Sequence, residues 1–335
     1  MREPRFWARD VDPKSREAAP LFRILCSPAA WLYAAITRRK IATTTPTSVS
    51  AKVVCVGNLT AGGVGKSPVV AGLRQHIETK HQLRVATLSR GYKGKLKGPL
   101  KVDPDQHSAT DVGDEPLMLA QTGEAWIGAD RSAAGQEMSS DGVDIILMDD
   151  GHQNPGLHKD LSLIVVDSVA GFGNGFVIPK GPLREPVLEG LSRADAVIIL
   201  GDGNPPAIIF DSGLPVFHGR IAPTREIQEG PYVAFAGIGR PEKFFDTLAN
   251  AGAVLADAIP YPDHYTYTPS DLRYLRQLAR ERGARLITTE KDMARLAPAD
   301  RDDIETLPIE LQFDQIEALD KLIADVIKPS ANGKD

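Results

Sequence analysis

Residues 51–67, with the sequence AKVVCVGNLTAGGVGKS, constrain the fold of this chain more than any other segment. The apolar run at its start predicts a buried strand, and the glycine-rich turn that follows ends on Lys66 and Ser67. Because glycine has no Cβ, the backbone of such a turn can surround phosphate oxygens with its N–H groups. Lys66 then supplies a cation for the β- and γ-phosphates, and the Ser67 hydroxyl supplies a ligand for Mg²⁺. The segment therefore predicts a phosphate-binding loop between a strand and a helix.

The turn departs in one place from the pattern G-x-x-x-x-G-K-[ST], whose first glycine would fall at Thr60. A glycine-rich loop with an exposed lysine is the alternative, but the preceding strand and a helix over residues 69–79 favour a nucleotide site. Gly62, Gly63 and Gly65 leave the backbone free to take positive φ. The expected cofactor-binding residues are Thr60, Ala61, Gly62, Gly63, Val64, Gly65, Lys66 and Ser67.

Composition narrows the class of protein. A chain of 335 residues with 42% hydrophobic and 25% charged residues is typical of a soluble globular protein of one large or two ordinary domains. Its net charge of −5 argues against a general nucleic-acid binder. Two cysteines cannot build a disulfide framework, so we expect a reducing, cytosolic setting.

The first 40 residues differ in charge from the rest, with nine Lys or Arg and four Asp or Glu. Residues 24–37 carry no charge, contain Trp31 and Tyr33, and precede three consecutive cations. Ser27 followed by Pro28 predicts a helix that begins there with Ser27 as its N-cap. The segment is too short to cross a bilayer and does not resemble a secretory signal. It is either an amphipathic arm in a membrane interface or a helix packed on its own domain.

Apolar runs alternate with helical stretches after this arm, which predicts an α/β fold with a mostly parallel sheet flanked by helices. The expected strands cover residues 52–56, 84–88, 144–148, 161–166 and 196–200. A passage rich in proline and glycine, residues 201–231, precedes a second, smaller α/β lobe. Its expected strands cover residues 232–237, 254–259 and 285–289, and its helices 241–251, 270–282 and 314–327. The expected divisions are an arm (1–40), a P-loop NTPase-like core (41–225) and a second lobe (226–335).

Two long polar stretches, residues 91–114 and 171–193, should lie over the carboxyl edge of the sheet, where α/β proteins bind ligands. The strand DIILMDD ends there in Asp149 and Asp150, which predicts a Mg²⁺ site. Asp149 is the expected ligand. Asp150 is either a supporting carboxylate or one close to the phosphates. In isolation, Asp150 followed by glycine would indicate only a turn.

A kinase also needs an acceptor for the proton of the attacking hydroxyl group. Asp114, in the sequence DVGDE, is a candidate base, although a helix cap explains this acid equally well. His264 lies in a loop of aromatic residues and could orient such a base, although a lone histidine there is more often structural. Residues 289–292, with the sequence TEKD, resemble the guanine-reading motif N-K-x-D of GTPases. The register does not match, because position 293 is Met293, so GTP is not predicted.

The ordered motifs VGNLTAGGVGKSP, LSRGY, GDEP, DR, DDGHQN, GFGNG with IPKGPLREP, DHY and TTEKD resemble the tetraacyldisaccharide 4′-kinases. The resemblance runs from about residue 20 to about residue 325. It implies a membrane-associated P-loop kinase that uses ATP and Mg²⁺ to phosphorylate the 4′-hydroxyl of a tetraacyldisaccharide 1-phosphate in lipid A biosynthesis. It also implies a peripheral position at the cytoplasmic face of the inner membrane, with the arm facing lipid. Neither nucleic acid nor an obligate protein partner is expected.

The resemblance implies roles for individual residues. Asp114 would be the base with His264 as its partner, Lys66 would serve the phosphates, and Ser67, Asp149 and Asp150 would form the metal site. The positions that match the family's cleft are Tyr92, Glu115, Arg131, Gln153, Arg184 and Glu185. His152 and Lys180 depart from the family pattern.

Two other functions are compatible with the phosphate loop alone. A membrane-associated switch or partitioning ATPase shares the GGxGK[ST] core, but it carries a lysine where this chain has Ala61. A P-loop kinase of a soluble metabolite would have no use for the arm.

Overall fold

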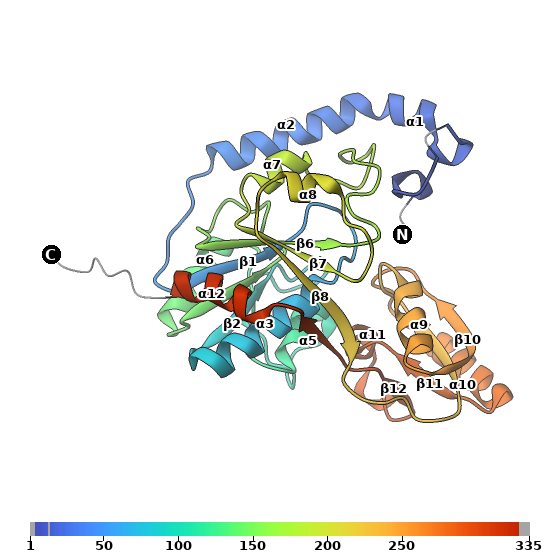
Figure 1. The fold of residues 1–335 in the computed structure, drawn as a ribbon. Helices are drawn as coiled ribbons and strands as arrows, with labels where there is room; N and C mark the ends of the chain where they lie inside the picture. Colours follow the sequence, from blue (N-terminus) through green and yellow to red (C-terminus); the bar gives the residue numbers. More distant parts are fainter. Residues whose placement is uncertain (1–3, 13, 328–335) are drawn as a thin grey trace.

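The structure, a computed structural model, describes residues 4–12 and 14–327. Its core is a nine-stranded sheet in the order β13-β8-β7-β6-β1-β5-β2-β4-β3, with helices on both faces (Figure 1). These strands are β1 (Lys52–Gly57), β2 (Val85–Ser89), β3 (Leu100–Lys101), β4 (Ala125–Ile127), β5 (Ile145–Asp149), β6 (Leu161–Asp167), β7 (Ala196–Leu200), β8 (Val216–Pro223) and β13 (Ile309–Phe313).

A second sheet of four parallel strands has the order β10-β9-β11-β12. It comprises β9 (Pro231–Ala236), β10 (Val254–Pro260), β11 (Arg285–Thr288) and β12 (Ile304–Thr306). The helices are α1 (Pro20–Leu25), α2 (Ser27–Thr43), α3 (Lys66–His81), α4 (Ala109–Val112), α5 (Asp114–Ala120), α6 (Arg131–Ser140), α7 (Val187–Leu191), α8 (Ala207–Asp211), α9 (Pro241–Asn250), α10 (Pro269–Arg282), α11 (Glu290–Arg295) and α12 (Ile316–Ile327). Short 3₁₀ turns are η1 (Arg5–Trp7), η2 (Arg16–Ala18) and η3 (Pro298–Asp300).

Alternation along β1 explains the layers of the first sheet. Val54 and Val56 belong to the apolar cluster under α3, α5 and α12, whereas Val53 and Cys55 belong to the cluster under α6. Successive side chains of a strand point to opposite faces, so a central strand buried on both faces is apolar throughout. The expected α/β fold with a mostly parallel sheet is therefore confirmed. Among the strands of the described residues, the edge strands β13 and β3 pair antiparallel with their neighbours β8 and β4.

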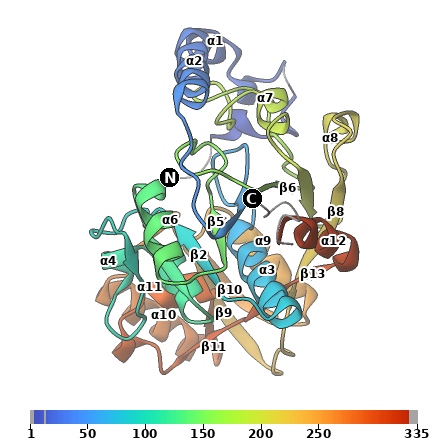
Figure 2. The same ribbon diagram turned by 90° about the vertical axis from the view of Figure 1, so that its left-hand side faces the viewer.

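Residues 309–327 do not belong to the second lobe, contrary to the expected range of 226–335. Strand β13 pairs antiparallel with β8 in the first sheet, and Leu319 and Ile323 of α12 lie in its core. In the sequence, the strands of the second sheet are thus inserted between β8 and β13, which are neighbours in the first sheet (Figure 2). Local patterning could not reveal this return, because the partner of a strand is set by the tertiary fold.

Helix α12 is fastened to α3 by a buried carboxylate. Asp320 accepts hydrogen bonds at 2.8 Å from Nε2 of both His76 and His81, and Nζ of Lys80 lies 3.1 Å away. Burial alone would raise the pKa of Asp320, but these three partners lower it to about 2. A carboxyl group with a lowered pKa stabilises the fold above its ordinary pKa, and this contribution is lost as pH falls from about 4 toward 2.

We expect Asp320→Asn to lower the free energy of unfolding by about 2 kcal/mol, because three donors lose their charged acceptor. The midpoint of thermal unfolding should fall by about 4 °C, measured by circular dichroism at pH 7. Glu317→Gln on the exposed face of the same helix is the matched control. Equal midpoints for the two variants would contradict the assigned role of Asp320.

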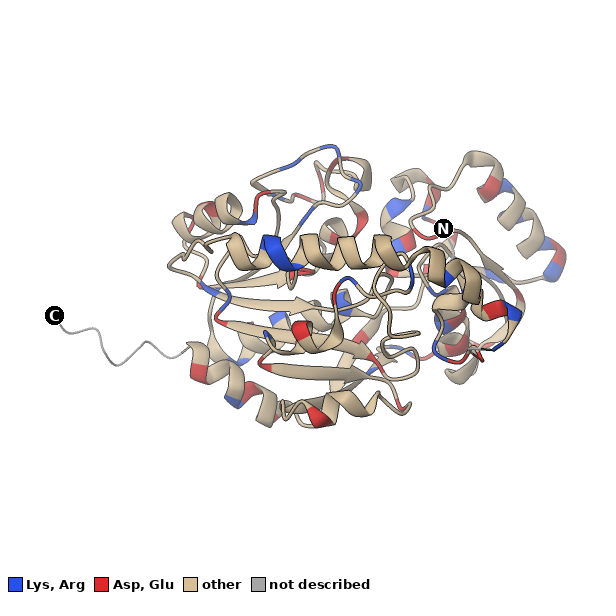
Figure 3. Ribbon diagram, turned by 90° about the horizontal axis from the view of Figure 1, so that it is seen from above, with Lys and Arg blue, Asp and Glu red and all other residues tan. Residues whose placement is uncertain are grey.

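The N-terminal helices leave their apolar side chains uncovered. Helix α2 lies over α7 and is free of charged residues until its last turns (Figures 1 and 3). Leu25 is 77% exposed and Trp31 is 71% exposed, and Ala30 alone in α2 is buried. The prediction that Ser27 is the N-cap of α2 is wrong, because Ser27 is the first residue of the helix and its hydroxyl donates to the carbonyl of Arg23.

No single helix in residues 4–12 and 14–327 is long and apolar enough to cross a membrane. The segments 16–25 and 27–43 together satisfy the length and composition required, with a bend of 67° between them.

Candidate active site

A cleft of about 1910 Å³ opens at the carboxyl ends of the strands in the first sheet and extends to the second lobe. The glycine-rich turn lies in it between β1 and α3, so Lys66 and Ser67 are the first two residues of a helix. Gly62 and Gly65 have φ of +105° and +92°, a conformation that favours glycine. Gly63 does not have positive φ. The amides of the turn and the positive end of α3 together form the expected anion-binding geometry.

The second lobe touches this turn directly. Gly239, between β9 and α9, lies so close to Gly63 that a Cβ on Gly239 would come within 3.2 Å of the Gly63 nitrogen. Glycine at 239 therefore permits the close approach of the two lobes at the phosphate loop.

Lys66 is held in place by polar partners at the base of the cleft. Its Nζ donates to Oδ1 of Asn58 at 3.2 Å and lies 3.5 Å from Oδ1 of Asp150. Arg184 donates to the same Asp150 oxygen at 2.6 Å. Burial would raise the pKa of Asp150, but Lys66 and Arg184 hold it well below its usual range. Asp150 is thus an ionised carboxylate that positions two cations.

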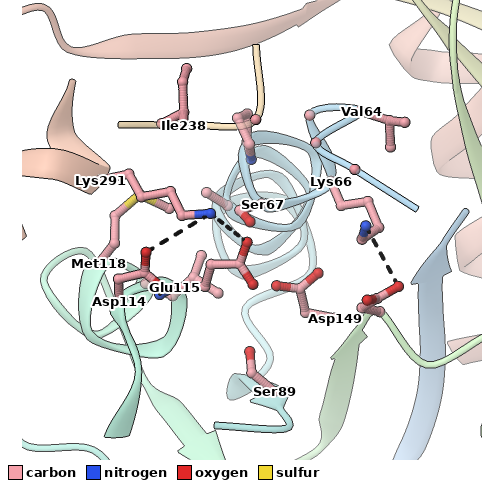
Figure 4. A pocket seen from close by; sticks show the side chains of 18 of the residues that line it. Val64, Lys66, Ser67, Ser89, Asp114, Glu115, Met118, Asp149, Ile238 and Lys291 are labelled. Atoms are coloured by element: carbon pink, nitrogen blue, oxygen red, sulfur yellow. Dashed lines mark hydrogen bonds and ion pairs between the residues drawn. The ribbon is translucent and has the colours of Figure 1, made fainter. Parts of the chain in front are cut away.

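Asp149, at the end of β5, has a different environment. Its side chain is almost wholly buried, yet neither carboxylate oxygen has a hydrogen-bond partner among the described residues. Burial, with the neighbouring charge of Glu115, raises the pKa of Asp149 well above its usual range. Figure 4 shows Ser67 and Asp149 facing the same space, between Lys66 and Lys291. Two unpartnered carboxylate oxygens beside a hydroxyl group fit a Mg²⁺ ion.

No group of three or more histidine, cysteine or acidic side chains in the described ranges could hold a metal ion by itself. Mg²⁺ in nucleotide-binding enzymes is held by one or two carboxylates together with the phosphates. Two further buried polar atoms without partners, Oγ of Ser89 and Nε of Arg131, belong to residues that line the cleft. The cleft therefore contains polar groups that a polar ligand could satisfy.

The two members of the expected catalytic pair are 150 positions apart in the chain and meet across the lobes. Nδ1 of His264 lies 2.9 Å from Oδ2 of Asp114, at the start of α5. Since that oxygen is ionised, Nδ1 carries the proton of this hydrogen bond. Burial would raise the pKa of Asp114, but His264, Lys291 and Arg295 hold it far below its usual range.

Sequence reasoning missed two cations beside this pair, Lys291 and Arg295 of α11. Lys291 donates to Oε1 of Glu115 at 2.8 Å and lies 4.0 Å from Oδ2 of Asp114 (Figure 4). Arg295 donates to Oδ2 of Asp114 at 2.8 Å through Nε. Lys291 lies in the motif TTEKD and Arg295 three residues beyond it, and both belong to the short helix that follows β11.

The other predicted cleft residues divide into two groups. Tyr92, Glu115, Arg131, Gln153 and Arg184 all line the cleft. The ring of Tyr92 packs edge-on against His264, with centroids 5.6 Å apart. Glu185 does not line the cleft. It is buried, and it binds Arg193 at 2.6 Å and Gln153 at 2.9 Å, which makes it a support for Gln153.

Thr60, the first residue of the predicted loop, does not line the cleft either. It is buried and pairs with Leu183, and the amide of Ala61 donates to the carbonyl of Pro182 at 2.7 Å. The turn 181–186, which carries Arg184, is thereby fixed to the phosphate loop.

His152, a departure from the family pattern, is buried behind the site. Its Nε2 donates to the carbonyl of Gly190 at 2.9 Å, and burial lowers its pKa to about 3, so the ring is neutral. A Cβ at Gly57 would come within 2.5 Å of the Cβ of His152. Lys180, the other departure, lies over the ring of Phe176, 4.1 Å from its centroid.

Helix α2 also reaches the cleft. Tyr33, Ile36, Thr37 and Lys40 line the same space as the phosphate loop. An ion pair between Arg38 and Glu189 of α7 fastens this helix to the first lobe. One end of the cleft is therefore walled by the apolar arm.

Comparisons with known proteins agree with this geometry. Residues 22–328 match the family model described as tetraacyldisaccharide-1-P 4′-kinase. The chain is 55% identical over 328 residues to the tetraacyldisaccharide 4′-kinase of Hyphomonas neptunium, covering 98% of each chain. It is 47% identical over 337 residues to that of Maricaulis maris, covering 98% of this chain and 97% of the relative.

A solved structure is also similar. It is the crystal structure of the "apo" form of LpxK from Aquifex aeolicus in complex with ATP, with 26% identity and a TM-score of 0.72. The match covers 91% of this chain and 99% of the other.

Proposed function

The chain belongs to the tetraacyldisaccharide-1-P 4′-kinase family, and from this we propose how its residues divide the work of the reaction. The protein transfers a phosphoryl group from ATP to the 4′-hydroxyl of the tetraacyldisaccharide 1-phosphate precursor of lipid A. The alternatives of a partitioning ATPase and of a soluble-metabolite kinase are set aside by this membership. The observation that supports the division of roles is the meeting of Asp114 and His264 across the cleft from the phosphate loop.

The phosphate loop and Lys66 bind the triphosphate. Backbone amides of residues 61–67 and the positive end of α3 face its oxygens, and the Lys66 ammonium offsets their charge. Asn58 and Asp150 keep that ammonium in one place, so little reorganisation accompanies transfer.

Ser67 and Asp149 would hold Mg²⁺, with Asp150 close by. When bound, the ion would offset the negative charge of the phosphates. The unpartnered oxygens of Asp149 support this assignment.

Asp114 accepts the proton of the 4′-hydroxyl, and His264 orients it. Oδ2 of Asp114 is occupied by His264 and Arg295, whereas Oδ1 accepts only the amide of Glu115 among the contacts of the described residues. Oδ1 therefore has a lone pair that can receive the sugar proton.

We also propose that helices α1 and α2 place the enzyme at the cytoplasmic face of the inner membrane. Their exposed apolar side chains suit the hydrocarbon boundary, and the cations at residues 38–40 suit anionic headgroups. Because α2 also lines the cleft, a lipid acceptor could enter the site while its acyl chains stay in the bilayer.

The double substitution of Trp31 and Leu32 by glutamate should reduce binding to vesicles of anionic phospholipid by at least about tenfold. The reason is that two charged side chains replace two apolar ones that favour the hydrocarbon boundary. Co-sedimentation measures the binding.

Mass spectrometry of the acceptor lipid after incubation with Mg-ATP should show one phosphate added to the non-reducing sugar by the unmodified enzyme. The variant should form less of this product. Val254→Glu, an equally exposed site in the second lobe, is the matched control. Equal loss of binding in that control would contradict the assignment.

A further inference from the structure

Arg295 is a charged side chain buried at the junction of the two lobes. It belongs to α11 in the second lobe, and its side chain is only 6% exposed. A buried guanidinium is costly unless its donors are satisfied by acceptors of opposite or partial negative charge. Its contacts therefore show what the position requires.

One edge of the Arg295 guanidinium faces the first lobe. Nε donates to Oδ2 of Asp114 at 2.8 Å, and Nη2 donates to the same oxygen. That oxygen also receives Nδ1 of His264 at 2.9 Å. Arg295 and His264 thus converge on one oxygen of the candidate base and fix the plane of its carboxylate.

The remaining nitrogen of Arg295 faces the loop that carries His264. Nη1 donates to the carbonyl of Gly237 at 2.6 Å, and that carbonyl also accepts the amide of His264 at 3.0 Å. One guanidinium therefore holds Asp114 directly and the backbone of His264 through a single shared acceptor.

Asp292 keeps Arg295 itself in a single orientation. Its Oδ1 accepts Nη1 of Arg295 at 2.7 Å and the hydroxyl of Tyr267 at 2.9 Å. The amide of Gly237 donates to both carboxylate oxygens at 3.0 and 3.1 Å, and Oδ2 accepts the hydroxyl of Thr289 at 2.7 Å. Asp292 is fully buried, so this arrangement is rigid.

We propose that Arg295 is a positioning residue for phosphoryl transfer, which assembles the Asp114–His264 pair when the second lobe lies against the first. This inference rests on the proposed role of Asp114 as the base. Arg295 does not contact the acceptor. It sets the direction of Oδ1, the oxygen of Asp114 that accepts the Glu115 amide, relative to the sugar hydroxyl.

Charge is the second effect of Arg295. The groups that face Asp114 are Glu115 on α5, Lys291 and Arg295 on α11, and His264 with Asp263 in the loop before α10. Arg295 keeps Asp114 ionised, since it is one of the cations that hold the pKa of this carboxyl below its usual range. Loss of Arg295 should raise that pKa, so the acidic limb of the pH profile of kcat/KM should move to higher pH.

The test compares Arg295→Gln and Arg295→Lys with Arg276→Gln, a surface ion-pair arginine on α10. Arg295→Gln should lower kcat by about 100-fold, because a small misplacement of a reacting group has an effect of that size. The dissociation constant for a non-hydrolysable ATP analogue should stay within about twofold. Arg295→Lys keeps the positive charge but not the planar guanidinium. The acidic limb of its pH profile should therefore stay where it is in the unmodified enzyme, and kcat should fall by less than in Arg295→Gln. Arg276→Gln should match the unmodified enzyme.

A double-mutant cycle with Asp114→Asn separates positioning from a general structural role. If Arg295 acts through Asp114, adding Arg295→Gln to Asp114→Asn should lower kcat no further. Full additivity, or an unmoved acidic limb in a folded Arg295→Gln enzyme, would overturn the proposal. Normal turnover by Asp114→Asn alone would instead refute the base assignment, which is a separate result.

Discussion

Replacing Asp114 by asparagine is expected to lower kcat by about 1,000-fold while the dissociation constant for ATP changes little. General base catalysis by a positioned side chain contributes effects of this order. Asparagine keeps the shape of the side chain but has no lone pair basic enough to accept the sugar proton. Asp114 lies across the cleft from the phosphate loop, next to His264, so the substitution should not alter the affinity for ATP.

Single-turnover transfer to the lipid acceptor measures the chemical step, and fluorescence titration with an ATP analogue measures affinity. Asp111→Asn is the matched control, because Asp111 lies in the same segment, belongs to the capping box of α4 and is only half-buried. It should leave kcat unchanged. A large loss of ATP affinity with normal transfer in Asp114→Asn would show that the residue serves the nucleotide and not the acceptor.

Replacing Lys66 by alanine should damage both binding and chemistry, with a loss of about 1,000-fold in kcat/KM and a weaker affinity for ATP. The ammonium interacts with the phosphates before and during transfer, and removal of one such preorganised donor costs about 100- to 1,000-fold in kcat alone. Asp150 would keep Arg184 as its partner, so the fold around the site should persist.

Lys80→Ala, at the opposite end of the same helix, provides the control. Lys80 pairs with Asp320 far from the phosphate loop, so its loss should reduce stability slightly and leave turnover intact. Unchanged ATP affinity in Lys66→Ala would be incompatible with the proposed phosphate loop.

The central strands could be predicted from the sequence because buried parallel strands are continuous apolar runs. Strand β7 matches its expected range, β1 and β6 each extend one residue further, and β2 and β5 are each shifted by one residue. Strand β4 has only three residues, too few for a periodic signal, and β8 lies within the passage rich in proline and glycine that was expected to separate the lobes. Strand β13 is an edge strand whose place depends on β8.

The site was predictable to the extent that it is local in sequence. The phosphate loop is one contiguous motif, and Asp149 follows the apolar strand that positions it. Asp114 and His264, by contrast, come together only through the contact of two lobes, so family resemblance was needed to pair them. Arg295 is an ordinary arginine at a helix end by sequence, and only its burial against Asp114 distinguishes it.

The second sheet leaves the first from the end of β8 and rejoins it at the start of β13, where Pro223 is paired directly with Ile309. The two connections between the lobes therefore lie side by side. Because these two connections are hydrogen-bonded neighbours, a twist of one lobe against the other would disrupt the pairing of β8 with β13. The place of His264 beside Asp114 is thereby restrained by this strand pairing as well as by their direct contact.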